Sequence, residues 1–209
     1  VVGGGGIAGV NHGLINECYN LGAIGTTGTA SSNDDDTYTY SVIGGIAGLN
    51  KGTIRNCFNE NQVFVGRYYK LYPKTEEQLE NEDYSTGTNY RIRVGGIAGM
   101  NVGTKEGEKF TGGIIEQSMN FGRIHGDMRV GGIAGESSGL VTSCFSSCFQ
   151  GARKDLGGIV GYQSDNNPGV VEYCASISRI QSNKREVALR DGSTFQAAEL
   201  TDNKGTSEI

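Results

Sequence analysis

The chain of 209 residues is long enough for one or two globular domains, and its composition excludes several classes of protein. Glycine accounts for 35 residues and proline for only 2, and because the glycines follow no Gly-X-Y period, the chain is not a collagen. A net charge of −5 without any basic run argues against nucleic acid and anionic membrane as partners. No stretch approaches the roughly 18 consecutive apolar residues of a membrane span, so we expect no membrane insertion within this segment.

The dominant feature of the sequence is the pentapeptide Gly-Gly-Ile-Ala-Gly, which occurs five times, with Val160 replacing alanine in the last copy. The copies occupy residues 5–9, 44–48, 95–99, 131–135 and 157–161. In three of the five repeats a cysteine follows 13 residues after the first glycine, whereas the loops between repeats vary in length. Repetition at this scale indicates a solenoid, a propeller or an array, and the absence of a composition break favours one elongated domain.

Each repeat holds three apolar segments, which in the first copy lie near Ile7, at 15–19 and at 23–24. They are about five residues long and are separated by Asn-x-Gly turns, so they predict strands rather than helices. The shortest repeat interval, 26 residues, fits three such strands and three turns but not a four-stranded propeller blade. A leucine-rich repeat would need regularly spaced leucines, which are missing. The sequence therefore predicts an all-β fold, a right-handed parallel β-helix (β-solenoid) of about five coils, with the hand taken from the preference of parallel crossovers.

Stacked coils place equivalent side chains about 4.8 Å apart, so the repeat predicts ladders. One aliphatic ladder comprises Ile7, Ile46, Ile97, Ile133 and Ile159, and a second comprises Ile15, Ile54, Ile115, Val141 and Val171. A third ladder of small side chains comprises Cys18, Cys57, Ser118, Cys144 and Cys174. Because the second isoleucine and the cysteine of a repeat are three residues apart, a bend or bulge must separate them if both point inward. Two further sets share turn positions and predict structural asparagine ladders, namely Asn11, Asn50, Asn101 and Asn20, Asn59, Asn120.

The five cysteines are an odd number, which argues against a closed disulfide framework. Directly stacked cysteines have poor geometry for a bridge, so we expect the ladder thiols to be free and buried. A local disulfide between Cys144 and Cys148 is the alternative to two ordinary thiols.

Insertions at 25–42, 64–93 and 104–112 interrupt the repeats, and the first two both follow the third strand of a coil. They should therefore leave the solenoid at the same edge and lie side by side. Their tyrosines are the candidate binding residues, because aromatic planes next to charged groups suit a sugar or an extended peptide. These residues are Tyr38, Tyr40, Tyr68, Tyr69 and Tyr72. The alternative is that the tyrosines only pack their own loops onto the solenoid.

Candidates for metal binding and catalysis are few. Asp34, Asp35 and Asp36 could ligate calcium, but they lack the spacing of a recognised calcium loop, and a solvated acidic tip is the simpler interpretation. The two histidines, His12 and His125, lie far apart in the repeat and predict no zinc site. We predict no cofactor. No Ser-His-Asp order, nucleophile elbow or HExxH helix is present, so we predict no enzymatic activity.

The repeat resembles the GLUG-motif repeats of secreted and surface proteins of bacteria, including immunoglobulin-A-peptidase-type and adhesin-like proteins. The shared letters are Gly-Gly-Ile-Ala-Gly, Asn-x-Gly, Ile-x-x-Cys-Tyr/Phe-Asn and Gly-x-Ile, over roughly residues 3–180. The fourth copy departs from the motif because Glu136-Ser137-Ser138 replaces the Asn turn, and the fifth departs because Ala175-Ser176 replaces the aromatic-Asn pair. The resemblance implies an extracellular or cell-surface β-solenoid, and it implies no catalytic residues because the motif is structural.

These observations predict a solenoid over 1–180 and a C-terminal cap or tail over 181–209, with further repeats or domains upstream because the sequence begins inside a repeat. The expected function is a non-catalytic extracellular module of a bacterial surface or secreted protein, for adhesion or ligand binding through its inserted loops. A glycan or a host extracellular protein is the expected partner. The first alternative is a passive spacer or scaffold of a larger secreted peptidase or surface protein. The second is a β-helix carbohydrate-active enzyme with acids among Asp34, Asp35 and the pair Glu76 and Glu77, although nothing places two of them on one face.

Overall fold

The structure is a computed structural model, and it describes residues 2–26, 41–65, 92–107, 109–126, 128–152, 154–163, 166–182, 186–188 and 194–196. Every regular element in these ranges is a β-strand. Within the same ranges no helix is long and apolar enough to cross a membrane.

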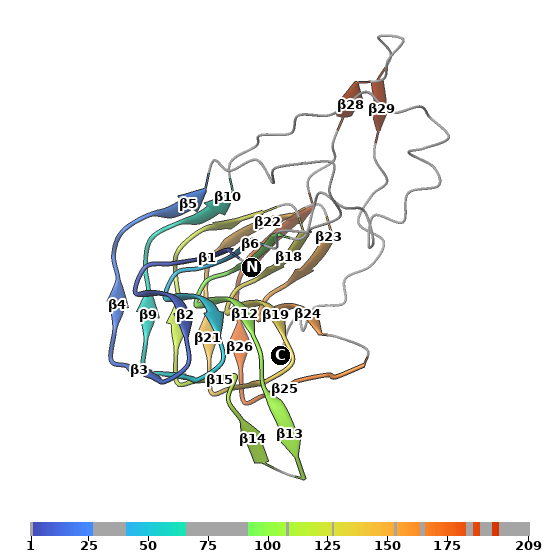
Figure 1. Cartoon of the computed structure of the whole chain (residues 1–209). Helices are drawn as coiled ribbons and strands as arrows, with labels where there is room; N and C mark the ends of the chain where they lie inside the picture. The colour runs from blue at the N-terminus through green and yellow to red at the C-terminus, as the bar shows by residue number, and fades with distance from the viewer. Residues whose placement is uncertain are drawn as a thin grey trace.

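Five parallel sheets of five strands each form the body of the molecule, and each coil contributes one strand to every sheet (Figure 1). Sheet A contains β1 (Val2–Gly5), β6 (Ser41–Gly44), β11 (Ile92–Gly95), β18 (Met128–Gly131) and β23 (Lys154–Gly157). Sheet B contains β2 (Ala8–Asn11), β7 (Ala47–Asn50), β12 (Ala98–Asn101), β19 (Ala134–Ser137) and β24 (Val160–Gln163). Sheet C contains β3 (Leu14–Asn16), β8 (Thr53–Arg55), β15 (Ile114–Glu116), β20 (Leu140–Thr142) and β25 (Val170–Glu172). Sheet D contains β4 (Tyr19–Asn20), β9 (Phe58–Asn59), β16 (Met119–Asn120), β21 (Phe145–Ser146) and β26 (Ala175–Ser176). Sheet E contains β5 (Ile24–Thr26), β10 (Val63–Val65), β17 (Ile124–His125), β22 (Phe149–Ala152) and β27 (Arg179–Ser182).

This arrangement confirms the predicted parallel β-helix of five coils, but each coil has five short strands rather than three. The glycine-rich segment is two strands, because the chain bends at Gly6 and Ile7 between sheets A and B. The segment that carries the cysteine is also split, into a strand of sheet C and a strand of sheet D. The predicted aliphatic ladders are present, and the amide of Ile46 donates a hydrogen bond of 3.0 Å to the carbonyl of Ile97 in the next coil.

A left-handed residue lies immediately before each member of the Cys/Ser ladder and provides the bend that the spacing predicted. The φ angles are 56° at Glu17, 53° at Asn56, 49° at Gln117, 53° at Ser143 and 54° at Tyr173. One residue with this conformation turns the chain between sheets C and D, so that the isoleucine and the cysteine can both face the interior. Ile54 and Cys57 accordingly are both buried.

The interior has two apolar clusters separated by a polar seam. One cluster contains Ile54, Ile97, neighbouring apolar residues of sheets B and C, and the buried ladder cysteines. The other contains Val94 of sheet A, Ile124 of sheet E and their apolar neighbours. Between them runs one of the predicted asparagine ladders, in which Asn59 donates a hydrogen bond of 2.6 Å from Nδ2 to Oδ1 of the next asparagine. Repeating amide hydrogen bonds satisfy polar groups that would otherwise be costly to bury.

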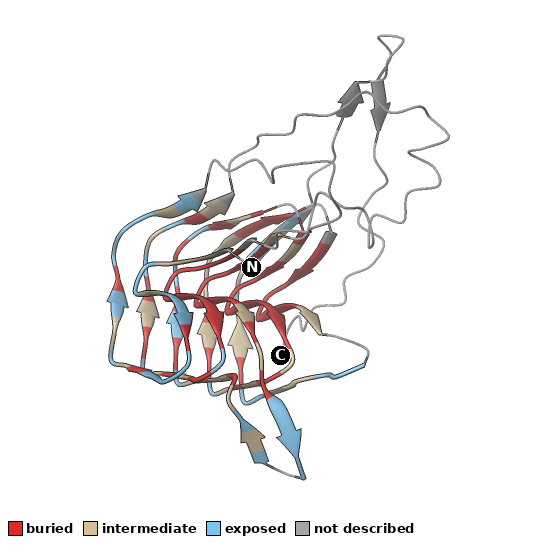
Figure 2. Ribbon diagram, viewed as in Figure 1, coloured by how far each residue is buried: buried red, intermediate tan, exposed pale blue. Residues whose placement is uncertain are grey.

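Glycine allows sheets A and B to approach each other at the backbone. A β-carbon at Gly135 would lie 2.6 Å from the amide nitrogen of Val94 and 2.6 Å from the carbonyl oxygen of Arg129. Any other residue would push the two sheets apart, which explains why the core is thin at the pentapeptide. The inner coils are buried on this side, whereas much of the first coil is exposed because it has a neighbour on only one face (Figure 2).

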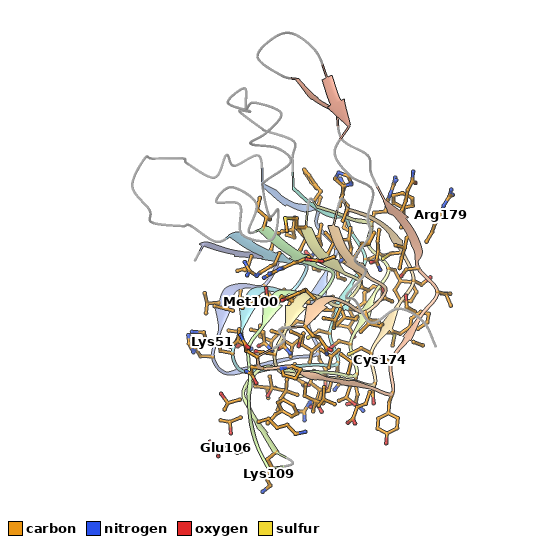
Figure 3. The ribbon with its side chains drawn as sticks, turned by 90° about the vertical axis from the view of Figure 1, so that its right-hand side faces the viewer. Lys51, Met100, Glu106, Lys109, Cys174 and Arg179 are labelled. Atoms are coloured by element: carbon orange, nitrogen blue, oxygen red, sulfur yellow. The ribbon has the colours of Figure 1, made fainter. Side chains whose placement is uncertain are left out.

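The insertions leave the coils as the sequence predicted. The first joins β5 to β6 and the second joins β10 to β11, and because β5 pairs with β10 and β6 with β11, both leave the solenoid at the same edge. The third is an antiparallel hairpin of β13 (Thr104–Glu106) and β14 (Lys109–Thr111), which projects from the third coil with Glu106 and Lys109 near its tip (Figure 3). Strand β27 ends at Ser182, two residues beyond the predicted boundary, and is followed by the antiparallel pair β28 (Glu186–Ala188) and β29 (Thr194–Gln196). That residues 181–209 form a cap stays a prediction.

Candidate ligand-binding surface

The residues that the sequence singled out for binding lie outside the described residues. They are Tyr38, Tyr40, Tyr68, Tyr69 and Tyr72, together with the calcium candidates Asp34, Asp35 and Asp36. The acids considered for an enzyme, including Glu76 and Glu77, lie in the same undescribed ranges. All of these assignments therefore stay predictions.

The structure shows another aromatic surface, on the outer face of sheet D. In the second coil Cys57 and Asn59 point inward and are buried, so Phe58 between them points outward by the alternation of a strand. The same pattern orients its counterparts in the other coils. Four rings make consecutive contacts across four coils, and we call them the aromatic row: Tyr19, Phe58, Phe121 and Phe145. The ring centroids are 6.3 Å apart for Tyr19 and Phe58, 5.3 Å for Phe58 and Phe121, and 5.8 Å for Phe121 and Phe145.

The aromatic row is open to solvent. Tyr19 is 64% exposed and Phe121 is 42% exposed, and Met119, which lies between Phe58 and Phe145 in the register of sheet D, is 46% exposed. Two further exposed apolar residues, Leu21 and Ile177, follow sheet D in the first and last coils. Contiguous exposed apolar surface of this kind marks interaction sites in soluble proteins, whereas single exposed apolar residues do not.

A cationic group occupies the outer face of the adjoining sheet E. The guanidinium carbon of Arg123 lies 5.2 Å from the centroid of the Phe149 ring, and that of Arg179 lies 6.0 Å from it. We call these three residues the arginine clamp. The side chains of the clamp point outward because the residue after each of them faces the interior, as Ile124 and Gln150 do. Figure 3 shows Arg179 at the outside of the coil stack.

A buried charge cluster lies between sheets A and B. The carboxylate of Glu136 accepts a hydrogen bond from Nε of Arg93 and a hydrogen bond of 2.6 Å from Nη1 of Arg129. Arg129 also lies 3.9 Å from a carboxylate oxygen of Asp155 and 4.0 Å from the ring centroid of Tyr162. Since Glu136 and Asp155 are buried and engaged with arginine, this cluster is suited to holding the two sheets together rather than to acid-base chemistry.

The thiols form the predicted ladder and are free. Cys57, Cys144 and Cys174 are buried, but the prediction of burial is wrong for Cys18 of the first coil, which is half-buried. Cys148, the candidate for a local disulfide with Cys144, is also free and half-buried.

The environment of the thiols shifts three of their pKa values. A side-chain hydrogen bond from Cys144, supported by a backbone hydrogen bond, lowers the pKa of Cys174 to about 7. The same side-chain hydrogen bond, together with burial, raises the pKa of Cys144. Burial also raises the pKa of Cys57. Among the described residues no group of three or more His, Cys, Asp and Glu side chains is arranged to hold a metal ion.

The sequence contained a signal for the aromatic row that the repeat analysis did not use. In Cys-Tyr/Phe-Asn the first and third residues belong to buried ladders, so the aromatic residue between them has to face outward. The arginine clamp had no such signal, because the residues equivalent to Arg123 in the first two coils are Ala23 and Gln62. Comparison of the chain with protein-family models, curated proteins and solved structures found no match. The resemblance to GLUG-motif repeats therefore stays a prediction.

Proposed function

We propose that the chain is a non-catalytic ligand-binding module of an extracellular bacterial surface or secreted protein, and that its ligand, a glycan or a host protein, lies against the aromatic row. The observation that carries the proposal is the continuous contact of four partly exposed rings over four coils. The extracellular bacterial setting rests on the resemblance of the repeats. The tyrosines of the two long insertions stay candidates for the same function.

The chemistry of the row suits a ligand with flat apolar faces. Aromatic rings offer a large contact area with few rotatable bonds, so a ligand that packs on them orders little side-chain freedom. The strands beneath the rings pair on both sides in the second, third and fourth coils, which holds the surface in one shape before a ligand arrives. Such preorganisation improves affinity because less conformational entropy is lost on binding. The apolar faces of sugar rings and the side chains of a protein partner both fit this surface.

A passive spacer is the second candidate, and one observation favours it. The rings of the row are tilted by 54°, 44° and 55° to one another, a geometry typical of aromatic side chains that pack together. In a spacer the row would only shield the backbone of sheet D from water. The two functions differ in what happens when the rings are removed.

The test is a glycan-array and extracellular-matrix screen of the intact chain and of a Tyr19→Ser/Phe121→Ser variant. Tyr173→Ser is the matched control, because Tyr173 is 83% exposed, lies outside the row and occupies a position where the fourth coil has Ser143. We expect a ligand whose binding is lost in the row variant and kept in the control. A variant lacking residues 68–83 tests the second insertion in the same screen. Ligand binding that is unchanged in the row variant would exclude the row, and a screen without any binding would favour the spacer.

A further inference from the structure

We infer that the arginine clamp is a subsite for acidic sugars, so that the ligand of this surface is a polysaccharide that carries carboxylates. This inference rests on the proposed function and specifies its ligand class. Arg123 and Arg179 belong to the third and fifth coils, and Phe149 lies between them in the fourth. The two arginines are therefore two rungs apart, or roughly 9.6 Å along the solenoid axis.

The charges of the clamp have no carboxylate partner in the described part of the chain. The ion pairs there join Arg93 and Arg129 to Glu136 and Asp155, and none involves Arg123 or Arg179. Both arginines are exposed, and their contacts with Phe149 fix the guanidinium groups near one ring. A guanidinium held in this way can still donate two parallel hydrogen bonds to a carboxylate, which is the geometry that arginine favours. In a chain of net charge −5, two exposed arginines on one face that form no ion pair with any described residue point to an anionic ligand.

The aromatic surroundings favour a sugar over other anions. Phe121 of the aromatic row and Arg123 of the clamp are separated only by Gly122, so the row and the clamp lie on adjoining outer faces, and they overlap in the third and fourth coils. One extended polymer can therefore place apolar sugar faces on the rings and carboxylates at the arginines. An acidic peptide that binds by adding a strand would need a free sheet edge, which the described part of sheet E has at β27 but not at β17 or β22. Such a peptide would lie beside Arg179 rather than across all three residues of the clamp. Nucleic acid is disfavoured because the chain is acidic overall and has no basic run.

The experiment compares polygalacturonate, a polymer of anionic sugars, with the same polymer after methyl esterification, which removes the charge and keeps the backbone. The proteins are the full chain, the variant Arg123→Gln/Arg179→Gln, and the variant Lys105→Gln/Lys109→Gln. The lysine variant is the matched control, because it removes the same charge from the exposed hairpin of β13 and β14. Isothermal titration calorimetry gives each affinity, and the thermal unfolding midpoint confirms that each variant is folded.

We expect the intact chain to bind the acidic polymer about tenfold or more tightly than the ester, which corresponds to about 1.4 kcal/mol. The arginine variant should lose this preference, and the lysine variant should keep it. Raising the ionic strength from 0.05 M to 0.5 M should weaken binding of the acidic polymer and leave binding of the ester unchanged, as expected for exposed charges. These two ionic strengths are chosen so that the Debye length changes from above to below about 10 Å.

Four results would overturn the inference. The first is a preference for the acidic polymer that persists in the arginine variant. The second is equal binding of both polymers by the intact chain. If the Tyr19→Ser/Phe121→Ser variant then binds both polymers more weakly than the intact chain does, the proposed function stands and only the acidic ligand class is wrong. The third is equally tight binding of polyglutamate or oligothymidylate, which would show a general anion site. A chain that binds neither polymer refutes the acidic-sugar subsite, and the broader screen then decides whether the aromatic row binds anything.

Discussion

The ring of Phe121 lies 5.3 Å from the ring of Phe58, although the two residues occupy different positions in their repeats. Phe58 follows the ladder cysteine directly, and its partner in the register of sheet D is Met119 rather than an aromatic residue. Phe121, two residues further along, supplies the missing ring and also contacts Phe145 in the next coil. The aromatic row therefore stays continuous through the third coil, although the repeat position there is not aromatic.

Removal of this ring tests whether the row serves binding or only covers the sheet. Phe121→Ala should weaken binding of the ligand identified in the screen by about tenfold or more, because it leaves Phe145 without a ring contact to the remaining pair of Tyr19 and Phe58. Its effect on stability should be below about 1 kcal/mol, since the side chain is 42% exposed. Differential scanning calorimetry would then show a decrease of less than about 4 °C in the unfolding midpoint. A much larger decrease with unchanged binding would identify Phe121 as a structural cover.

The ladder of small side chains predicts that Ser118→Cys is neutral or slightly stabilising. The Ser118 hydroxyl donates a hydrogen bond of 2.9 Å to the carbonyl of Glu116 and accepts one of 3.2 Å from the amide of Cys57. The thiol of Cys144 donates to the carbonyl two residues before it in the same way, at 3.2 Å. Ser118→Ala should cost about 1–3 kcal/mol, because the amide of Cys57 would lose its partner in the core. A decrease of more than about 5 °C in the unfolding midpoint of Ser118→Cys would contradict the ladder assignment.

The buried charge cluster predicts opposite effects for single and paired substitutions. Glu136→Gln should destabilise the fold by about 3–5 kcal/mol, because it removes the buried carboxylate that accepts hydrogen bonds from Arg93 and Arg129. The paired change Arg93→Val/Glu136→Leu should recover part of that loss, since the second coil already holds the apolar residues Val42 and Leu49 at the equivalent positions. The recovery is partial because Arg129 still loses the carboxylate of Glu136. Urea unfolding of the three proteins at one pH measures both effects. A paired variant less stable than Glu136→Gln would show that the charges are required for more than mutual neutralisation.

The pair Cys144 and Cys174 predicts a pH-dependent reactivity. Because the pKa of Cys174 is lowered to about 7, its thiolate population should increase as the pH rises through about 7. Its alkylation by iodoacetamide should increase with the thiolate population, although the reaction is slow at a thiol that is only 6% exposed. Cys144→Ala removes the hydrogen bond that stabilises the thiolate, so the midpoint should move upward toward 9.0, the ordinary value for the thiol. Peptide mapping of the folded protein over pH 6–9 locates the modified cysteine. An unchanged midpoint in Cys144→Ala would rule out this explanation.

Much of the fold could be predicted from the repeat. The pentapeptide gave the number of coils, and the alignment of isoleucines and cysteines gave the ladders, because a solenoid repeats each environment at each rung. The three-residue spacing between Ile54 and Cys57 required a bend, which the structure places at Asn56. The division into five strands could not be predicted, because the left-handed position carries Glu17, Asn56, Gln117, Ser143 and Tyr173, which share no residue type.

The candidate site was predicted less well than the fold. The outward direction of Tyr19, Phe58 and Phe145 follows from strand alternation after a ladder cysteine, so three of the four rings of the aromatic row could have been found from the repeat alone. The remainder depends on departures from the repeat. Phe121 lies two residues beyond the motif position, and the arginine clamp uses a single repeat position that carries, in successive coils, Ala23, Gln62, Arg123, Phe149 and Arg179. The consensus of the repeat contains the residues that all coils share, whereas ligand binding depends on the residues that differ between coils.

The central claim, that ligand binds along the outer face of sheet D, is tested most directly by mapping backbone amide chemical shifts during titration with the strongest ligand from the screen. The account predicts that the largest shifts fall in β4, β9, β16 and β21, and that they extend into β22 if the ligand is acidic. Shifts confined to residues 104–112 or to the insertions at 25–42 and 64–93, with sheet D unchanged, would contradict it.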